Sequence, residues 1–146
     1  MEAKLMPEAA TTEQMLHEVD LFAGVKKRHL RRLLKSARET EHQAGHVVAD
    51  EGLHALAFHL ILSGNASVRV GTKEVGRLRS GDYFGEISMI DGNARSASVV
   101  AVQPLRTIAI NRQPFLDLLD SEPVFARAVL EGLCARVRTA EARPTS

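Results

Sequence analysis

Apolar and polar positions along the chain change their spacing twice. Near the N-terminus, apolar residues recur at i, i+3, i+4 and i+7: Leu30, Leu33, Leu34 and Ala37. This spacing predicts an amphipathic helix over residues 25–38. Near the C-terminus, apolar residues recur every four positions: Phe125, Val129, Leu133 and Val137. This predicts that a long final helix begins at Pro123, since proline is tolerated in the first turn of a helix.

Between these helical segments lie short, β-branched apolar runs separated by turn residues. They predict strands at residues 46–49, 57–62, 66–70, 74–78, 96–102 and 106–110. Short strands with glycine-containing turns are typical of sandwiches, jelly rolls and small barrels. With helices before and after, the pattern predicts an α+β fold: an antiparallel β-roll or jelly roll flanked by N-terminal helices and two C-terminal helices.

The same pattern suggests boundaries along the chain. We expect a flexible tail at residues 1–10 and a single domain over residues 11–143. Within it, the segments are N-terminal helices at 11–40, the β-roll at 41–110 and C-terminal helices at 111–143. Thr11 and Gln14 fit a capping box, which predicts that the first helix begins after Thr11.

Composition narrows the class of protein. A chain of 146 residues can bury a core as one domain. Its net charge of +1 predicts no general affinity for nucleic acids or membranes. Cys134 is the only cysteine, which excludes an intrachain disulfide and fits a reducing compartment. The N-terminal residues lack the apolar stretch of a signal peptide, so we expect a cytoplasmic protein.

Metal binding and catalysis find little support in the sequence. Six histidines occur, among them His42 and His46 four apart and His54 and His59 five apart. No cysteine or carboxylate cluster accompanies them at zinc-site spacing, so no metal is expected. Nucleophile–base signatures and phosphate-binding P-loops are also missing, and we expect a protein that is not an enzyme.

The most informative run spans residues 83–99. Gly85 and Glu86 open a short apolar turn, and nine residues after Glu86 comes Arg95, followed by small residues and a β-branched strand. An arginine fork can grip two phosphate oxygens. Glu86 would repel phosphate, but its carboxylate accepts a hydrogen bond from a ribose hydroxyl. The combination therefore favours a nucleotide over a simple anion.

This run resembles the phosphate-binding cassette of cyclic nucleotide-binding domains, as found in catabolite activators and protein kinase A regulatory subunits. The matching parts are Phe84-Gly85-Glu86 and the Arg-Ser-Ala-Ser-Val run at 95–99. Further similar segments lie at residues 21–24, 44–48, 60–64 and 79–83, so the resemblance covers most of the chain. Departures occur at residues 54–57, at His59, where the family usually has an aromatic or apolar residue, and at Ala94, where proline is common.

The resemblance implies roles for particular residues. The cyclic phosphate would be bound by Arg95, Ser96, Ala97, Ser88 and Ile87. The ribose would be bound by Glu86 and Gly85. The base would pack against Val70, Leu78, Leu133, Arg136 and Val137, with the final helix acting as a lid.

The implied ligand is a 3′,5′-cyclic nucleotide, with cAMP favoured by the family and cGMP left open. No other cofactor, no direct nucleic-acid contact and no membrane contact are expected. Partners would be an unidentified effector and a second copy in a homodimer. Two alternatives remain: a regulatory piece of a larger protein such as a transcription factor, and a scaffold domain that has lost nucleotide binding.

Overall fold

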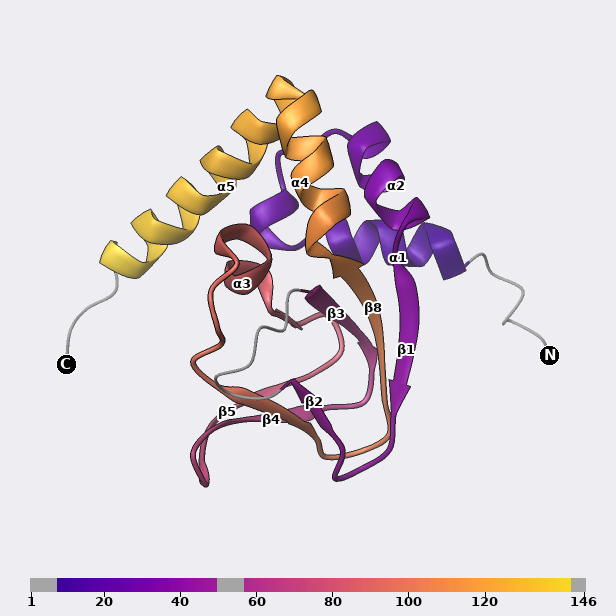
Figure 1. Cartoon of the computed structure of the whole chain (residues 1–146), viewed down its shortest axis with the longest axis vertical. Helices are drawn as coiled ribbons and strands as arrows, with labels where there is room; N and C mark the ends of the chain where they lie inside the picture. The colour runs from indigo at the N-terminus through magenta and orange to yellow at the C-terminus, as the bar shows by residue number, and fades with distance from the viewer. Residues whose placement is uncertain (1–7, 50–56, 143–146) are drawn as a thin grey trace. The chain divides into compact units, whose positions relative to one another are not determined.

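The structure is a computed structural model that describes residues 8–49 and 57–142. Its residues fall into two compact units (Figure 1). Residues 36–116 form one, here called the strand unit, and the segments up to residue 35 and from residue 117 form the other, the helical unit. Within the described ranges, no helix combines the length and apolar character needed to cross a membrane.

The strand unit contains two four-stranded antiparallel sheets. The first has the order β1 (Arg38–His42), β8 (Leu105–Asn111), β3 (Ala57–Ser63) and β6 (Tyr83–Phe84). The second has the order β2 (Val47–Ala49), β7 (Ser98–Ala101), β4 (Ala66–Val70) and β5 (Lys73–Leu78). A short helix, α3 (Glu86–Asp91), follows β6. This arrangement confirms the predicted α+β fold with an antiparallel jelly roll.

The interior of this unit changes character along its length. One buried apolar cluster consists of Ala49, Ile61, Ala66, Phe84, Val99, Ala101 and Leu105. Two residues further along β3 and β8, on the same faces, lie His59 and Thr107. Both are buried, and His59 Nδ1 lies 2.9 Å from Thr107 Oγ1. The unit is therefore apolar at one end and polar toward the other.

All six predicted strands are present, with small shifts at their ends. β4 has the predicted bounds, whereas β7 is shorter than the predicted 96–102. The prediction of a helix reaching residue 38 is wrong, because α2 (Lys27–Lys35) ends earlier and β1 begins at Arg38. β1 has no apolar residue, and its strand state comes from pairing with β8 over five positions.

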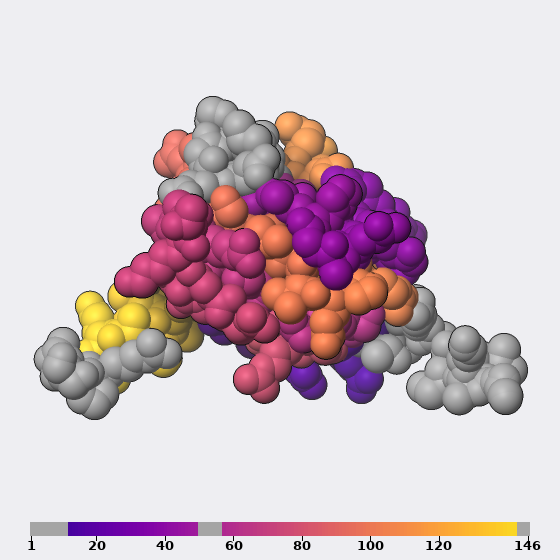
Figure 2. All heavy atoms as spheres, turned by 90° about the horizontal axis from the view of Figure 1, so that it is seen from below, coloured from indigo at the N-terminus to yellow at the C-terminus, as the bar shows by residue number. Residues whose placement is uncertain are grey.

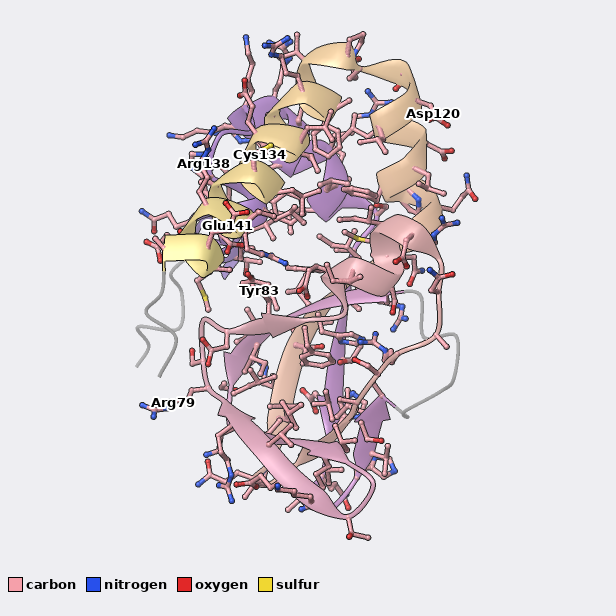
Figure 3. The ribbon with its side chains drawn as sticks, turned by 90° about the vertical axis from the view of Figure 1, so that its left-hand side faces the viewer. Arg79, Tyr83, Asp120, Cys134, Arg138 and Glu141 are labelled. Carbon is pink, nitrogen blue, oxygen red and sulfur yellow. The ribbon has the colours of Figure 1, made fainter. Side chains whose placement is uncertain are left out.

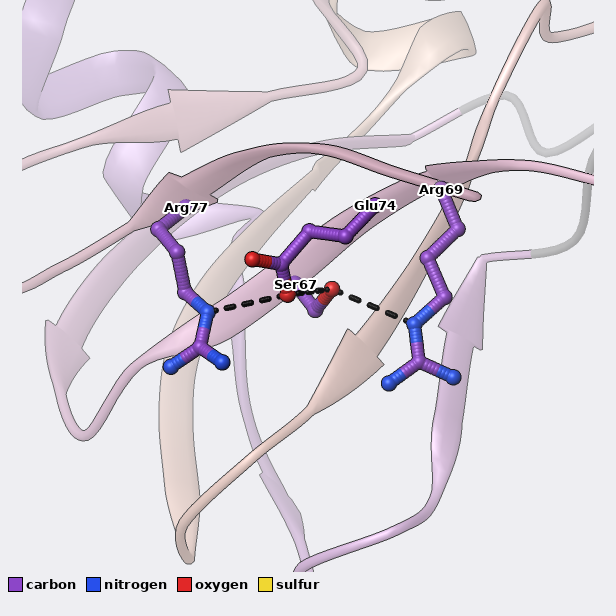
Figure 4. Close-up of polar contacts among 4 residues, drawn as sticks. All are labelled: Ser67, Arg69, Glu74 and Arg77. Carbon is purple, nitrogen blue, oxygen red and sulfur yellow. Dashed lines mark hydrogen bonds and ion pairs between the residues drawn. The ribbon is translucent and has the colours of Figure 1, made fainter. Parts of the chain in front are cut away.

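A polar cluster joins β4 to β5 (Figure 4). The buried Ser67 hydroxyl donates to Glu74 Oε1 at 2.6 Å, and Arg77 Nε donates to the same oxygen at 3.0 Å. Arg69 Nε donates to Ser67 Oγ at 3.1 Å. The Ser67 hydrogen bond and the Arg77 contact lower the pKa of Glu74. These contacts hold the hairpin that forms one wall of the site described below.

One end of the strand unit is closed by the loops that connect its strands. Seen from below, the orange β7–β8 connection lies between the magenta β4–β5 side and the purple β1–β2 side (Figure 2). The amide of Val102 donates to the carbonyl of Asn65 at 3.0 Å, which ties the β7–β8 connection to the β3–β4 turn.

The helical unit is built from α1 (Glu8–His17), the 3-10 helix η2 (Asp20–Phe22), α2, the second half of α4 (Arg112–Ser121) and α5 (Pro123–Ala142). α5 begins at the predicted proline. The predicted cap at Thr11 is wrong: α1 begins at Glu8, so Thr11 lies inside the helix. Residues 1–7 of the predicted tail lie outside the described residues.

α5 is fastened to η2 by two kinds of contact. Arg136 makes a two-pronged ion pair with Asp20, with Nη2–Oδ1 at 2.9 Å and Nε–Oδ2 at 3.3 Å. One turn earlier, a Cβ added at Gly132 would lie 2.7 Å from the carbonyl oxygen of Leu21 and 2.9 Å from that of Asp20. Only glycine lets the two backbones approach this closely.

We therefore expect Gly132→Ala to destabilise the protein, although alanine is the better helix former by about 1 kcal/mol. Forcing a methyl group against two backbone carbonyls should give a net loss of about 1–3 kcal/mol in the free energy of unfolding. Urea unfolding measures this loss. Arg127→Ala, at an exposed position of the same helix, is the control and should stay within about 0.5 kcal/mol of the wild type. Equal effects of both variants would contradict the close-packing interpretation.

Candidate functional site

The run predicted to bind phosphate forms the turn from β6 into α3. Gly85 precedes α3 with φ +88° and ψ 3°, a left-handed conformation that favours glycine. A Cβ at this position would lie 2.7 Å from Nη2 and 3.0 Å from Nη1 of Arg95. Gly85 is therefore required both by the turn and by the guanidinium packed against it.

Arg95 lies in the loop between α3 and β7 and is held by neighbours from two strands. Its Nη2 donates to the carbonyl oxygen of Ala57 at 2.9 Å, and its guanidinium carbon lies 5.8 Å from the ring centroid of Phe84. Its Nε is buried and has no hydrogen-bond partner among the described residues. Burial lowers the pKa of Arg95, and the nearby charge of Glu86 acts in the opposite direction. A desolvated cation with an unused donor is a strong anion binder.

A cavity of about 510 Å³ opens beside this arginine, and we call it the cassette pocket. It is lined from β4, β5, β6, α3 and the start of β7. The structure brings together in it eight of the predicted site residues: Leu78, Gly85, Glu86, Ile87, Ser88, Arg95, Ser96 and Ala97. Acidic, cationic and small residues thus line one cavity of nucleotide size.

Predicted base-packing residues are placed differently. Val70 does not line the cassette pocket; it lies 46% exposed at the tip of the β4–β5 hairpin, next to the turn at Gly71. Val68, two residues earlier, lines the pocket instead, as does Val99. Side chains alternate between the two faces of β4, so the sequence correctly indicates which face of the strand meets the pocket. Which residue along that face lines the pocket depends on the register of the hairpin.

The remaining base-packing candidates lie on α5, in the helical unit. Val137 is 54% exposed, Leu133 is partly buried, and Arg136 is engaged with Asp20. The sequence pattern does not reveal this ion pair, because its partners are 116 residues apart.

His59 occupies the position where the resemblance calls for an aromatic or apolar residue, and the structure gives a reason. Its ring stacks on Phe84, with centroids 4.8 Å apart and planes 5° from parallel. The ring therefore packs as an aromatic residue would. Burial and the charge of Arg95 lower the pKa of His59 to about 3, so the ring is neutral at physiological pH.

The histidine pairs do not form a metal centre within the described ranges. The rings of His42 and His46 lie 5.9 Å apart, but no group of three potential ligands occurs in this part of the chain. His54 lies outside the described residues.

Comparisons with known proteins give consistent findings. The model of the cyclic nucleotide-binding domain family matches residues 39–122. A cAMP-dependent protein kinase regulatory subunit from Aspergillus fumigatus is 32% identical over 119 residues, which cover 80% of this chain and 29% of the relative. A cGMP-dependent 3′,5′-cGMP phosphodiesterase A from Dictyostelium discoideum is 30% identical over 111 residues, 76% of this chain and 13% of the relative.

Among solved structures, the catabolite activator protein of Thermus thermophilus superposes with a TM-score of 0.67 and 28% identity. The match covers 84% of this chain and 60% of that structure. The chain thus spans less than a third of the length of either curated relative and 60% of the length of the solved structure.

The low pKa of His59 predicts a specific pH dependence of stability. The unfolded chain carries this histidine with an ordinary pKa near 6.5, so below that pH the unfolded state binds more protons than the native state. The free energy of unfolding should fall as the pH drops from 6.5 toward 3, by up to ~1.4 kcal/mol per pH unit from this group.

Urea unfolding of His59→Gln at pH 7 and pH 5 tests this dependence. The variant should lose less stability between the two pH values than the wild type. His17→Gln, on α1 in the helical unit, serves as the control and should keep the wild-type difference. An unchanged pH difference in His59→Gln would show that other groups cause it.

Proposed function

The chain belongs to the cyclic nucleotide-binding domain family, and on this premise we propose that it is a non-catalytic receptor module for a 3′,5′-cyclic nucleotide. The observation that carries the proposal is the Arg95 guanidinium. It lines the cassette pocket together with Glu86, and its buried Nε lacks a partner among the described residues. A singly charged phosphate diester would complete the hydrogen bonding of this cation.

The roles of the surrounding residues follow from the ligand. Arg95 would bind the cyclic phosphate, assisted by Ser96, Ala97 and the first amides of α3 at Ile87 and Ser88, which have no acceptor within the helix. Glu86 would accept a hydrogen bond from the ribose 2′-hydroxyl, and the backbone at Gly85 would allow close approach. Leu78 and Val68 would pack against the base from β5 and β4.

We favour cAMP over cGMP. The relative that matches the larger share of this chain is a cAMP-dependent regulatory subunit, whereas the Dictyostelium relative is cGMP-dependent. The Ser96 hydroxyl does not decide between them, because it can contact a phosphate oxygen or a guanine amino group.

We propose α5 as the ligand-responsive lid. Leu133, Arg136 and Val137 would supply its contacts with the base, and Arg136 would have to exchange Asp20 for the ligand. The ligand would then favour one of two arrangements of α5 through its differential affinity for them. An effector that responds to α5 completes the proposal, either as a separate protein or as a further part of a longer chain.

Calorimetric titration with cAMP and cGMP tests the proposal. We expect binding of both, with cAMP preferred in direct competition. Arg95→Gln should cost about 2–4 kcal/mol of binding free energy, because a charged phosphate contact is lost. Ser96→Ala should cost about 1 kcal/mol, as expected for a neutral hydrogen bond.

The outcomes separate the alternatives. No heat and no thermal shift with either nucleotide would favour the scaffold that has lost nucleotide binding. Equal losses in Arg95→Gln and Ser96→Ala would contradict the roles given to these residues. Circular dichroism of both variants checks that the fold is retained.

A homodimer formed through α5 is part of the proposal. Leu130 and Cys134 are exposed at i and i+4 of this helix, which places them on one face. Figure 3 shows Cys134 on α5, with Arg138 and Glu141 further along. Sedimentation should give a dimer mass, and Leu130→Glu should give a monomer. A monomeric wild-type protein at all accessible concentrations would refute this part.

A further inference from the structure

A second cavity, of about 520 Å³, lies within the strand unit, and we call it the arginine pocket. It is built on one face of the first sheet. Its wall carries Arg38, Thr40 and His42 at alternate positions of β1, and His59 from β3. Arg112, at the start of α4, and Arg95 complete the charged lining.

The lining of the arginine pocket is strongly cationic. It holds three arginines, and none of the described residues that line it is acidic. The hydrogen bonds that these arginines make with the described residues go to uncharged oxygens. Arg38 donates to Asn111 Oδ1 at 3.3 Å, and Arg112 donates to the carbonyl of Ile90 at 3.2 Å. Among the described lining residues, this cationic charge is therefore stabilised by dipoles and by no carboxylate. Glu86, which acts on the charge of Arg95, lines the cassette pocket instead.

Two of the three arginines also have unused donors. The Nε atoms of Arg95 and Arg112 are both buried, and neither has a hydrogen-bond partner among the described residues. A buried N–H without an acceptor costs free energy, and more so when it belongs to a charged group. Native structures rarely leave such donors unfilled, so each one calls for an explanation. An anionic ligand supplies the missing acceptors.

Thr40, His42 and His59 of the wall are linked through the buried Thr107. Thr107 Oγ1 lies 2.6 Å from Thr40 Oγ1 and 2.9 Å from His59 Nδ1, and His42 Nε2 lies 3.2 Å from Thr40 Oγ1. Burial lowers the pKa values of both His42 and His59. The chain therefore positions two neutral histidine rings in the wall, where they report on a bound charge.

We propose that the arginine pocket is a second anion site, which binds a phosphate-type oxyanion such as inorganic phosphate or a small phosphomonoester. Three arginine forks suit a doubly charged tetrahedral ligand. Binding at this site does not require a bound cyclic nucleotide. Because Arg95 lines both cavities, an anion in the arginine pocket competes for the guanidinium that the cassette pocket uses, and each ligand weakens the other.

Titration with inorganic phosphate, balanced by chloride at constant ionic strength, tests the proposal. The ring resonances of His42 and His59 in NMR spectra should shift and saturate with phosphate but not with chloride. Arg38→Gln should weaken this binding about tenfold or more, the effect of removing one charged contact. Arg38→Lys should restore part of the affinity, because it keeps the charge.

Arg127→Gln is the matched control. It removes the same charge from an exposed site on α5, outside both pockets, and should leave phosphate affinity unchanged. Equal weakening by Arg38→Gln and Arg127→Gln would show a general charge effect and overturn the proposal. Arg38 is exposed, so its substitution should preserve the fold, which a thermal melt checks.

Phosphate could instead bind only in the cassette pocket. In that case Arg38→Gln would leave phosphate affinity unchanged and the His42 resonance would not shift, which overturns the proposal. Cyclic nucleotide titrations in phosphate-free buffer separate the two ideas. Arg38→Gln should bind the nucleotide like the wild type there, and failure of all nucleotide binding would leave the phosphate result standing on its own.

Discussion

The half-buried guanidinium of Arg95 is the constraint on which this part of the strand unit depends. Arginine keeps its proton in proteins, so the cost of burying its charge must be met by surrounding dipoles. The carbonyl of Ala57, the ring of Phe84 and the backbone at Gly85 meet part of it. None of these groups accepts a hydrogen bond from the buried Nε of Arg95, and an anion can supply that acceptor. The packing around Arg95 and its capacity to bind an anion therefore have the same cause.

Phe84 has a second role, because it separates two environments. Its ring stacks on His59, which lines the arginine pocket. Phe84 itself lines the cassette pocket. A sandwich with a wholly apolar interior could not place a guanidinium between two cavities without a larger desolvation cost. The polar end of the interior, with its linked threonine and histidine side chains, makes this position tolerable for a charged group.

The helical unit depends on weaker and more local contacts. The ion pair between Arg136 and Asp20 is partly exposed, and surface pairs of this kind contribute about 0–1 kcal/mol. The close backbone approach at Gly132 is the more demanding contact. A lid that had to give up only the ion pair could switch at low cost, whereas one that also left η2 would need more binding energy from the ligand.

Residues near one another in the chain could be interpreted from the sequence. The strand at residues 66–70 and the α3 turn opened by Gly85 follow from β-branched runs and from a glycine that can adopt positive φ. The association of Glu86 with Arg95 also follows, since both belong to one short motif. These features depend on local spacing and backbone preference, which a single sequence carries.

Tertiary structure decided the rest. β1 is a strand because β8 pairs with it, although its own residues are charged or polar. The register of the β4–β5 hairpin places Val68 rather than Val70 in the cassette pocket. Stacking on Phe84 and burial beside Arg95 make His59 a neutral ring. The sequence by itself determined most of the elements and the anion-binding motif. Only the fold decided which distant side chains meet, because those contacts depend on strand pairing and burial that no local pattern encodes.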